Sequence, residues 1–189
     1  MGYGSIGKRH IQNLSNYSDI EIIVCTKRKQ DIFLKKNKCK VIKSLKKSIS
    51  ENPDFAIISN VTSLHIETAI ELANAGIHFL IEKPLSHNQN GVKKLLNVIK
   101  TKKLITLIGC HLRFHPCIIK IKEIIEKKKI GKVLAVQAQN SSYLPDWHPY
   151  ENYKESYAAK KELGGGVVLT SIHELDYLYW LFGKINDVF

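Results

Sequence analysis

The stretch that decides the fold is Gly2-Tyr3-Gly4-Ser5-Ile6-Gly7, which runs into Lys8-Arg9-His10-Ile11. Its G-x-G-x-x-G spacing is typical of a loop that holds a pyrophosphate at the start of a helix. The first glycine permits a tight turn, the second lets the backbone approach the phosphates, and the third lets the helix pack on a sheet. The free N–H groups at such a helix start favour an anion. The motif requires a preceding strand, and only Met1 stands before it, so the rest of the chain must support the prediction.

Downstream, short apolar runs alternate with amphipathic helical stripes. Strands are expected at residues 20–25, 40–42, 55–59, 77–82 and 104–109, and helices at 4–14, 45–49, 66–73 and 92–99. This alternation indicates βαβ units on a parallel sheet. The predicted fold class is therefore α/β, with a Rossmann-like parallel sheet domain over residues 1–115 that lacks its first strand. Ligands are expected at the carboxyl ends of the strands.

The pattern changes near His115-Pro116, where we place a domain boundary. Pro116 is expected to open a helix, and the alternating segment 133–139 predicts a strand. An aromatic loop, residues 143–150, follows, and a triple glycine at 164–166 precedes a helix that carries His173. Residues 116–189 are thus predicted to form a second, incomplete domain, to which the family resemblance described below gives an α+β fold and roles in substrate binding and dimerisation.

Composition narrows the function classes. Hydrophobic residues make up 44% of the 189 positions, which is ordinary for a globular core. There is no apolar run long enough to cross a membrane and no signal-peptide pattern, so we expect a cytoplasmic protein without a membrane partner. The formal net charge is +12, but the lysines are spread along the chain. Nucleic acid is therefore not expected as a partner. Nucleic-acid binding through the basic residues is kept as an alternative function.

The four cysteines are scattered and form no C-x-x-C pair, so no metal site or disulfide framework is predicted.

The turn Thr26-Lys27-Arg28 bears on the choice of cofactor. In a dinucleotide fold, the segment about 20 residues beyond the glycines faces the adenosine ribose. An acidic residue there would bind the 2′-hydroxyl and repel a 2′-phosphate, but the turn carries none. Basic residues suit a 2′-phosphate, so the sequence favours NADP over NAD. The alternative is a solvated basic turn.

Polar residues follow two of the expected strands. Asn60, Thr62 and His65 come after the strand at 55–59, and Lys83 stands between Glu82 and Pro84 after the strand at 77–82. A lysine there can donate a hydrogen bond to a substrate hydroxyl or act as an acid–base group if burial depresses its pKa. The following proline can hold the loop rigid, with a cis bond as one option.

His173, after the flexible glycines, is a candidate general base. Each of these residues also has a purely structural interpretation. Lys83 could be a surface lysine, His65 a packing histidine, and His173 part of a mixed polar helix face.

Taken in order, four segments resemble the Gfo/Idh/MocA oxidoreductase family over essentially the whole chain. They are the glycine motif, Glu82-Lys83-Pro84-Leu85, Arg113-Phe114-His115-Pro116, and the triple glycine with His173-Glu174-Leu175-Asp176. The resemblance implies a Rossmann-like nucleotide domain and a second α+β domain with a large, mostly antiparallel sheet. It also implies hydride transfer between NAD(P) and a hydroxyl-bearing carbon of a sugar, nucleotide sugar or cyclitol. Assembly into a homo-oligomer through the second sheet would follow for a full-length enzyme.

The resemblance places the catalytic roles on Lys83 and His173. Together, the motifs and the resemblance give these cofactor-binding candidates: Gly2, Gly4, Ser5, Ile6, Gly7, Thr26, Lys27, Arg28, Asn60, Thr62, His65, Glu82, Lys83 and Arg113.

The chain departs from the family pattern in two ways. Thr170 stands at the best match to a frequent family aspartate, and threonine cannot carry charge as a carboxylate does. Family members also have a strand before the glycine loop and more second domain. We therefore expect a fragment or a mis-started, truncated reading frame. A catalytically inactive nucleotide-binding relic or sensor is the alternative function.

Overall fold

The computed structural model describes residues 1–147 and 152–188. They divide into two compact units, one of Met1–Gly109 with Glu162–Gly164 and one of Cys110–Lys161 with Gly165–Phe189.

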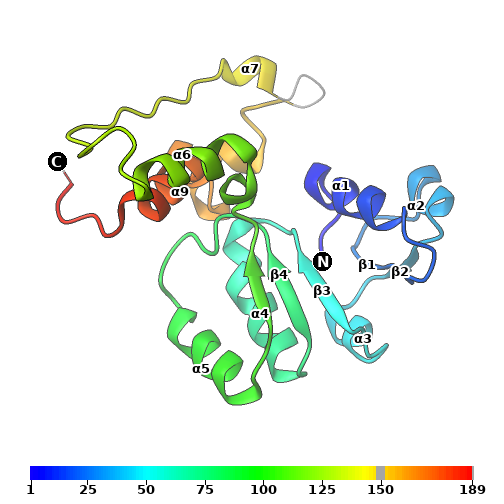
Figure 1. Cartoon of the computed structure of the whole chain (residues 1–189). Helices are drawn as coiled ribbons and strands as arrows, with labels where there is room; N and C mark the ends of the chain where they lie inside the picture. Colours follow the sequence, from blue (N-terminus) through cyan, green and yellow to red (C-terminus); the bar gives the residue numbers. More distant parts are fainter. Residues whose placement is uncertain (148–151, 189) are drawn as a thin grey trace. The chain divides into compact units, whose positions relative to one another are not determined.

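The first unit alternates strands and helices, as the sequence predicts (Figure 1). β1 and β2 form one parallel sheet, and β3, β4 and β5 form a second parallel sheet in that order. The strands are β1 (Ile23–Cys25), β2 (Lys40–Ile42), β3 (Phe55–Ile58), β4 (His78–Ile81) and β5 (Thr106–Ile108). Each strand expected in this unit is confirmed, and four of the five are shorter than expected.

The connecting helices also match the sequence pattern. They are α1 (Ser5–Leu14), α2 (Ile32–Lys36), α3 (Leu45–Ile49), η1 (Thr62–Leu64), α4 (His65–Asn74) and α5 (Val92–Lys102). Of these, the sequence pattern did not predict η1 or α2. The start of α2 is marked by Asp31, whose side chain accepts a hydrogen bond from the backbone N–H of Leu34, a usual helix cap.

Two apolar clusters hold this unit together. One joins the strands β3 and β4 to α4 and α5, with Ile58, Phe79 and Leu72 fully or almost fully buried. The other joins the glycine segment to β1 and α2 through Tyr3 and Leu34. Strands that are covered on both faces carry such continuous apolar runs.

The first two residues of the chain connect the two sheets. The Met1 nitrogen donates to the Ile57 carbonyl (2.6 Å) and the Met1 carbonyl accepts from Ser59 N (2.7 Å), while Gly2 N donates to the Cys25 carbonyl (3.2 Å). A cavity of about 510 Å³ adjoins them, and its lining includes residues 19–24 and 51–57. Among the described residues, β1 and β3 do not pair with each other.

The described part of the second unit is helical. It contains η2 (His111–Phe114), α6 (Pro116–Glu126), α7 (Leu144–Trp147), η3 (Tyr157–Ala159), α8 (Val167–Thr170) and α9 (His173–Phe182), and η4 (Lys161–Leu163) begins in it. Pro116 opens α6 as predicted, and the His115 side chain accepts from Cys117 N at its start.

The prediction of a strand at residues 133–139 was wrong. This segment has no regular structure, and Leu134 is 87% exposed. Alternating side chains make a strand only when a neighbouring strand supplies ladder bonds, and the described part of this unit contains no strand.

Within the described ranges, none of the helices combines the length and the apolar character needed to cross a lipid bilayer.

Candidate cofactor site

The glycine loop has the conformation that the motif predicts. Gly2 has a φ of +98°, and a Cβ there would lie 2.6 Å from Asn60 N and from the Ser59 carbonyl oxygen. A Cβ on Gly7 would lie 2.8 Å from the Gly2 carbonyl oxygen. Both distances are shorter than real contacts allow, so the loop and the start of α1 approach the end of β3 as closely as they do only because glycine occupies these positions.

Gly4 differs from its neighbours. It immediately precedes α1 with an extended conformation, and a Cβ built on it would meet nothing within 4 Å. The space next to it is therefore open. As the residue before α1, glycine also offers no side chain to accept from the first N–H groups of the helix. Such a helix start, with free N–H groups and an unobstructed approach, fits a phosphate group.

Tyr3 fixes the loop against α2. Its hydroxyl donates to the carboxylate of Asp31, with oxygen distances of 2.7 and 2.9 Å, and Asp31 also accepts from Leu34 N. Burial and the neighbouring carboxylate raise the pKa of Tyr3, so the phenol stays a donor. The Lys8 ammonium lies 5.0 Å from the centre of the Tyr3 ring. Neither Tyr3 nor Asp31 was among the sequence candidates.

The basic turn follows β1 directly. Thr26 N donates to the Ile42 carbonyl (3.0 Å), and the Thr26 hydroxyl oxygen accepts from Arg28 N (3.2 Å). Lys27 and Arg28 are exposed. Asp31 is the first carboxylate after the turn, and it is already bonded to Tyr3 and Leu34.

His65 ties two strand-end segments together. It is only 1% exposed. Its Nδ1 lies 2.9 Å from the Pro84 carbonyl oxygen and its Nε2 lies 3.1 Å from the Asn60 carbonyl oxygen. Burial lowers the pKa of this imidazole, so the neutral ring donates to one of these carbonyls. His65 thus holds the residues after β3 next to the Lys83-Pro84 peptide.

The Asn60 amide has one group satisfied and one available. Its nitrogen donates to the Thr68 hydroxyl (3.0 Å). Its Oδ1 is buried and accepts no hydrogen bond from the residues that the structure describes. Thr62, the next candidate along the chain, is also buried.

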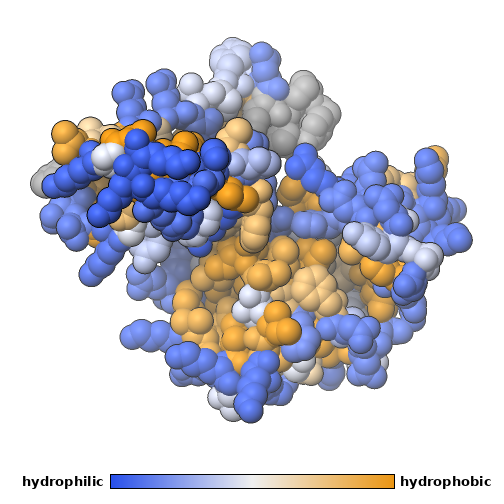
Figure 2. Space-filling model, in the orientation of Figure 1, coloured by the Kyte–Doolittle hydropathy of each residue, from blue (hydrophilic) through white to orange (hydrophobic). Residues whose placement is uncertain are grey.

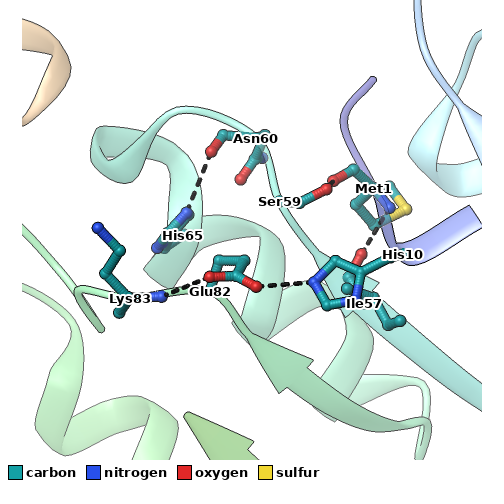
Figure 3. Close-up of polar contacts among 8 residues, drawn as sticks. All are labelled: Met1, His10, Ile57, Ser59, Asn60, His65, Glu82 and Lys83. Atoms are coloured by element: carbon teal, nitrogen blue, oxygen red, sulfur yellow. Dashed lines mark hydrogen bonds and ion pairs between the residues drawn. The ribbon is translucent and has the colours of Figure 1, made fainter. Parts of the chain in front are cut away.

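Glu82 lies at the centre of the polar group in Figure 3. One carboxylate oxygen is 2.7 Å from His10 Nε2, and the other accepts from Lys83 N (3.2 Å). The Lys83-Pro84 peptide is cis, the option that the sequence left open. His10 was not among the sequence candidates, because its contact with a residue 72 positions away has no local signal.

In the second unit, several polar side chains lie around α9. His173 is the first residue of this helix, and its ring packs edge-to-face against His111 with centroids 4.6 Å apart. Arg113 makes a two-pronged ion pair with Asp176, at 2.9 Å from Nε and 2.6 Å from the terminal nitrogen. Thr170 is buried, and its hydroxyl donates to the Gly166 carbonyl (2.6 Å).

The structure therefore gathers one set of candidates and leaves others elsewhere. Gly2 and Gly7 contact the end of β3, and Asn60, His65, Glu82 and Lys83 follow the ends of β3 and β4. The turn at residues 26–28 follows β1. Arg113 and His173 belong to the second unit, and Arg113's cofactor role stays a prediction.

Of the aromatic loop, residues 148–150 lie outside the described residues. Within the described ranges, no group of side chains has the makeup of a metal site.

The sheet order, the glycine loop and the strand-end residues define a Rossmann-type nucleotide-binding protein. Residues 1–110 match a family described as "Oxidoreductase family, NAD-binding Rossmann fold", and residues 118–189 match its "GFO/IDH/MocA C-terminal domain". The chain belongs to the GFO/IDH/MocA oxidoreductase family.

Similar proteins include dehydrogenases of sugars and cyclitols. Levoglucosan dehydrogenase of Pseudarthrobacter phenanthrenivorans is 30% identical over 146 residues, which cover 75% of this chain and 37% of that protein. Myo-inositol 2-dehydrogenase of Thermotoga maritima is 28% identical over 196 residues, covering 100% of this chain and 56% of that protein. The chain thus spans between about a third and somewhat over half of these relatives.

Among solved structures, the WlbA dehydrogenase of Bordetella pertussis, in complex with NADH and UDP-GlcNAcA, superposes with a TM-score of 0.78 at 22% identity. The match covers 97% of this chain and 54% of that one. This likeness supports the fold.

Proposed function

We propose that the chain is part of an NAD(P)-dependent oxidoreductase that transfers a hydride to or from a hydroxyl-bearing carbon of a sugar, nucleotide sugar or cyclitol. In this proposal, residues 1–115 bind the cofactor, and residues 116–189 contribute to substrate binding and dimerisation. The observation that carries it is Gly4, which precedes α1 and faces open space where a pyrophosphate would lie. The relatives named levoglucosan dehydrogenase and myo-inositol 2-dehydrogenase support the substrate class.

The residues present fit a dinucleotide. The amides of Ser5, Ile6 and Gly7 at the start of α1 hold the pyrophosphate, because an N-terminal helix end favours anions. The buried Asn60 Oδ1, which lacks a partner among the described residues, accepts a hydrogen bond from the cofactor. His65 keeps the backbone at Asn60 in place. Gly2 and Gly7 provide the close approach between the loop and β3.

The catalytic roles fall to Lys83 and His173. The bound nicotinamide supplies the hydride acceptor or donor. The Lys83 ammonium donates a hydrogen bond to the reacting oxygen and stabilises the charge that develops there as its proton is lost. His173 takes that proton or orients the hydroxyl. Glu82 holds the Lys83 backbone through the 3.2 Å bond.

For the cofactor, we propose NADP over NAD. Lys27 and Arg28 are exposed at the carboxyl end of β1, and the nearby Asp31 is already bonded to Tyr3 and Leu34. Arg and Lys at this place suit a 2′-phosphate.

A titration with NADPH and NADH tests this choice. NADPH is expected to bind more tightly, and Thr26→Asp should reverse the order, because a carboxylate at that turn accepts from a 2′-hydroxyl and repels a 2′-phosphate. Tighter binding of NADH by the wild type would overturn the NADP proposal and leave dinucleotide binding intact.

Turnover with a panel of sugars and cyclitols tests the reaction. Lys83→Ala is expected to lower kcat by about 100-fold or more, the usual share of a positioned acid–base group. Turnover retained in this variant would remove Lys83 from the mechanism.

One observation favours a second function, a nucleotide-binding protein without turnover. The Thr170 side chain, at the position where the family often has aspartate, directs its hydroxyl to the Gly166 carbonyl. Saturable cofactor binding with no turnover on the same panel, and none restored by Thr170→Asp, would favour this alternative.

A further inference from the structure

A polar contact joins the helix that follows the glycine loop to the segment that carries Lys83. His10 Nε2 and Glu82 Oε1 lie 2.7 Å apart, although the two residues are 72 positions apart in the sequence. His10 lies on α1, and Glu82 directly follows β4. Figure 3 shows the imidazole and the carboxylate facing each other.

The carboxylate of Glu82 has a hydrogen-bond partner on each oxygen and lies close to Gly109. Its Oε1 meets His10, its Oε2 accepts from Lys83 N, and a Cβ placed on Gly109 would lie 2.9 Å from Oε2. The Glu82 backbone N–H donates to the Ile58 carbonyl (2.9 Å), which fixes the main chain at the same point. Gly109 therefore leaves room for a carboxylate that any larger residue there would displace.

The ionisation state of Glu82 follows from its surroundings. Burial acts to raise the pKa of Glu82, but the His10 contact and the Lys83 amide outweigh it, and the net pKa lies below the usual value. Glu82 is therefore ionised at neutral pH. The side chains of His10 and Glu82 are only 24% and 14% exposed, so solvent weakens their attraction less than it would at a free surface.

We propose that His10 is a positioning residue that couples the glycine loop to Lys83 through Glu82. The chain of contacts is continuous: α1 carries the loop's amides at its first turn and His10 further along, His10 holds Glu82, and Glu82 holds the Lys83 amide. A ligand that fixes the start of α1 also fixes the place of Lys83, and by reciprocity the Lys83 segment influences ligand affinity. The functional importance of this link rests on the proposed function.

The first test needs no cofactor. The acetylation rate of each lysine is measured by mass spectrometry in the wild type, His10→Leu and His10→Gln, and Glu51→Gln serves as control because it alters the exposed Lys40–Glu51 pair in the same unit. We expect the Lys83 rate to change by about fivefold in His10→Leu, as for one lost hydrogen bond of ordinary strength. The glutamine amide can still donate to Glu82, so His10→Gln should stay close to wild type.

Two results would overturn the link. One is a Lys83 rate in His10→Leu equal to that of the wild type. The other is a uniform increase over all lysines of the first unit, which would mean that His10 holds the whole unit and not the Lys83 segment in particular. The control is expected to leave Lys83 unchanged.

The second test uses NADPH titration with His10→Leu, Glu82→Gln and the double variant. Each single change is expected to weaken binding by about fivefold, and the double change by no more than the larger single effect, because both break the same link. Strictly additive effects would overturn the coupling. If the wild type fails to bind NADH or NADPH while the acetylation result holds, the proposed function fails and the structural link stands.

Discussion

At the residue scale, the glycines of the loop play different parts. Gly2 and Gly7 are required by the protein itself, since a Cβ on either would collide with backbone atoms. Gly4 is not required in this way, because the space beside it is open. Its role is therefore the proposed one, which is to leave room for a phosphate.

Gly2→Ala should therefore destabilise the first unit. A Cβ 2.6 Å from Asn60 N, on a backbone with a φ of +98°, forces the loop to move or the residue to accept a strained conformation. We expect a loss of about 2 kcal/mol in the free energy of unfolding. Urea denaturation followed by circular dichroism measures it, and a variant as stable as wild type would contradict the packing described here.

His65 should make stability depend on pH. Its pKa is lowered by burial, so the unfolded chain binds its proton more readily than the folded one. The stabilisation is therefore complete above the unfolded-state pKa of about 6.5 and is lost as pH falls from there toward the lower folded-state value.

The unfolding free energy of wild type and His65→Gln, measured between pH 8 and pH 5, checks this. The wild-type advantage should shrink on acidification, while a constant difference across this range would show that His65 is not held neutral.

At the element scale, the Arg113–Asp176 pair attaches α9 to η2. Asp176 is mostly buried and Arg113 is about one-third exposed (side chains 13% and 36%), so the pair is partly screened by solvent. Arg113→Ala removes both hydrogen bonds and leaves the carboxylate unpaired, with an expected cost of about 1 kcal/mol. Hydrogen exchange of the α9 amides should accelerate in this variant. Exchange equal to wild type would mean that the apolar face of α9 alone holds the helix.

The elements that the sequence predicts correctly are those with local signals. β3 is a continuous apolar run, β4 is apolar after His78, and α4 shows helical spacing that ends near Gly76. Residues 133–139 alternate as a strand does, yet they are irregular, because pairing depends on a partner that no local pattern can specify. His10 was missed for the same reason, since its partner Glu82 is distant in sequence.

At the scale of the whole molecule, the first unit contains a cavity where strand pairing is interrupted. The cavity of about 510 Å³ is lined from both the β1 and the β3 sides, and Met1 and Gly2 already bond to Ile57 and Cys25 at its end. The sequence could indicate this place, because the glycine motif calls for a preceding strand. It could not indicate that β1 and β2 would form a sheet separate from that of β3, β4 and β5.

An apolar extension of about five residues before Met1, the length of an ordinary strand, should therefore raise the thermal midpoint by several degrees. The matched control is an extension of equal length with alternate residues changed to lysine, which cannot enter an apolar cavity. Equal midpoints for the two extensions would contradict the expected parallel strand at this place.

The most direct test of the account is NADPH binding to Gly4→Ala. A Cβ at Gly4 meets nothing within 4 Å, and its φ of −91° suits any residue, so the variant should unfold at the wild-type temperature. Gly131→Asn, at an exposed turn in the other unit, controls for a glycine change elsewhere. We predict saturable NADPH binding by the wild type and the control, and affinity lower by about tenfold or more in Gly4→Ala, because the methyl group displaces a phosphate. Equal affinity for wild type and Gly4→Ala, or no binding by the wild type, would contradict a dinucleotide site at this loop.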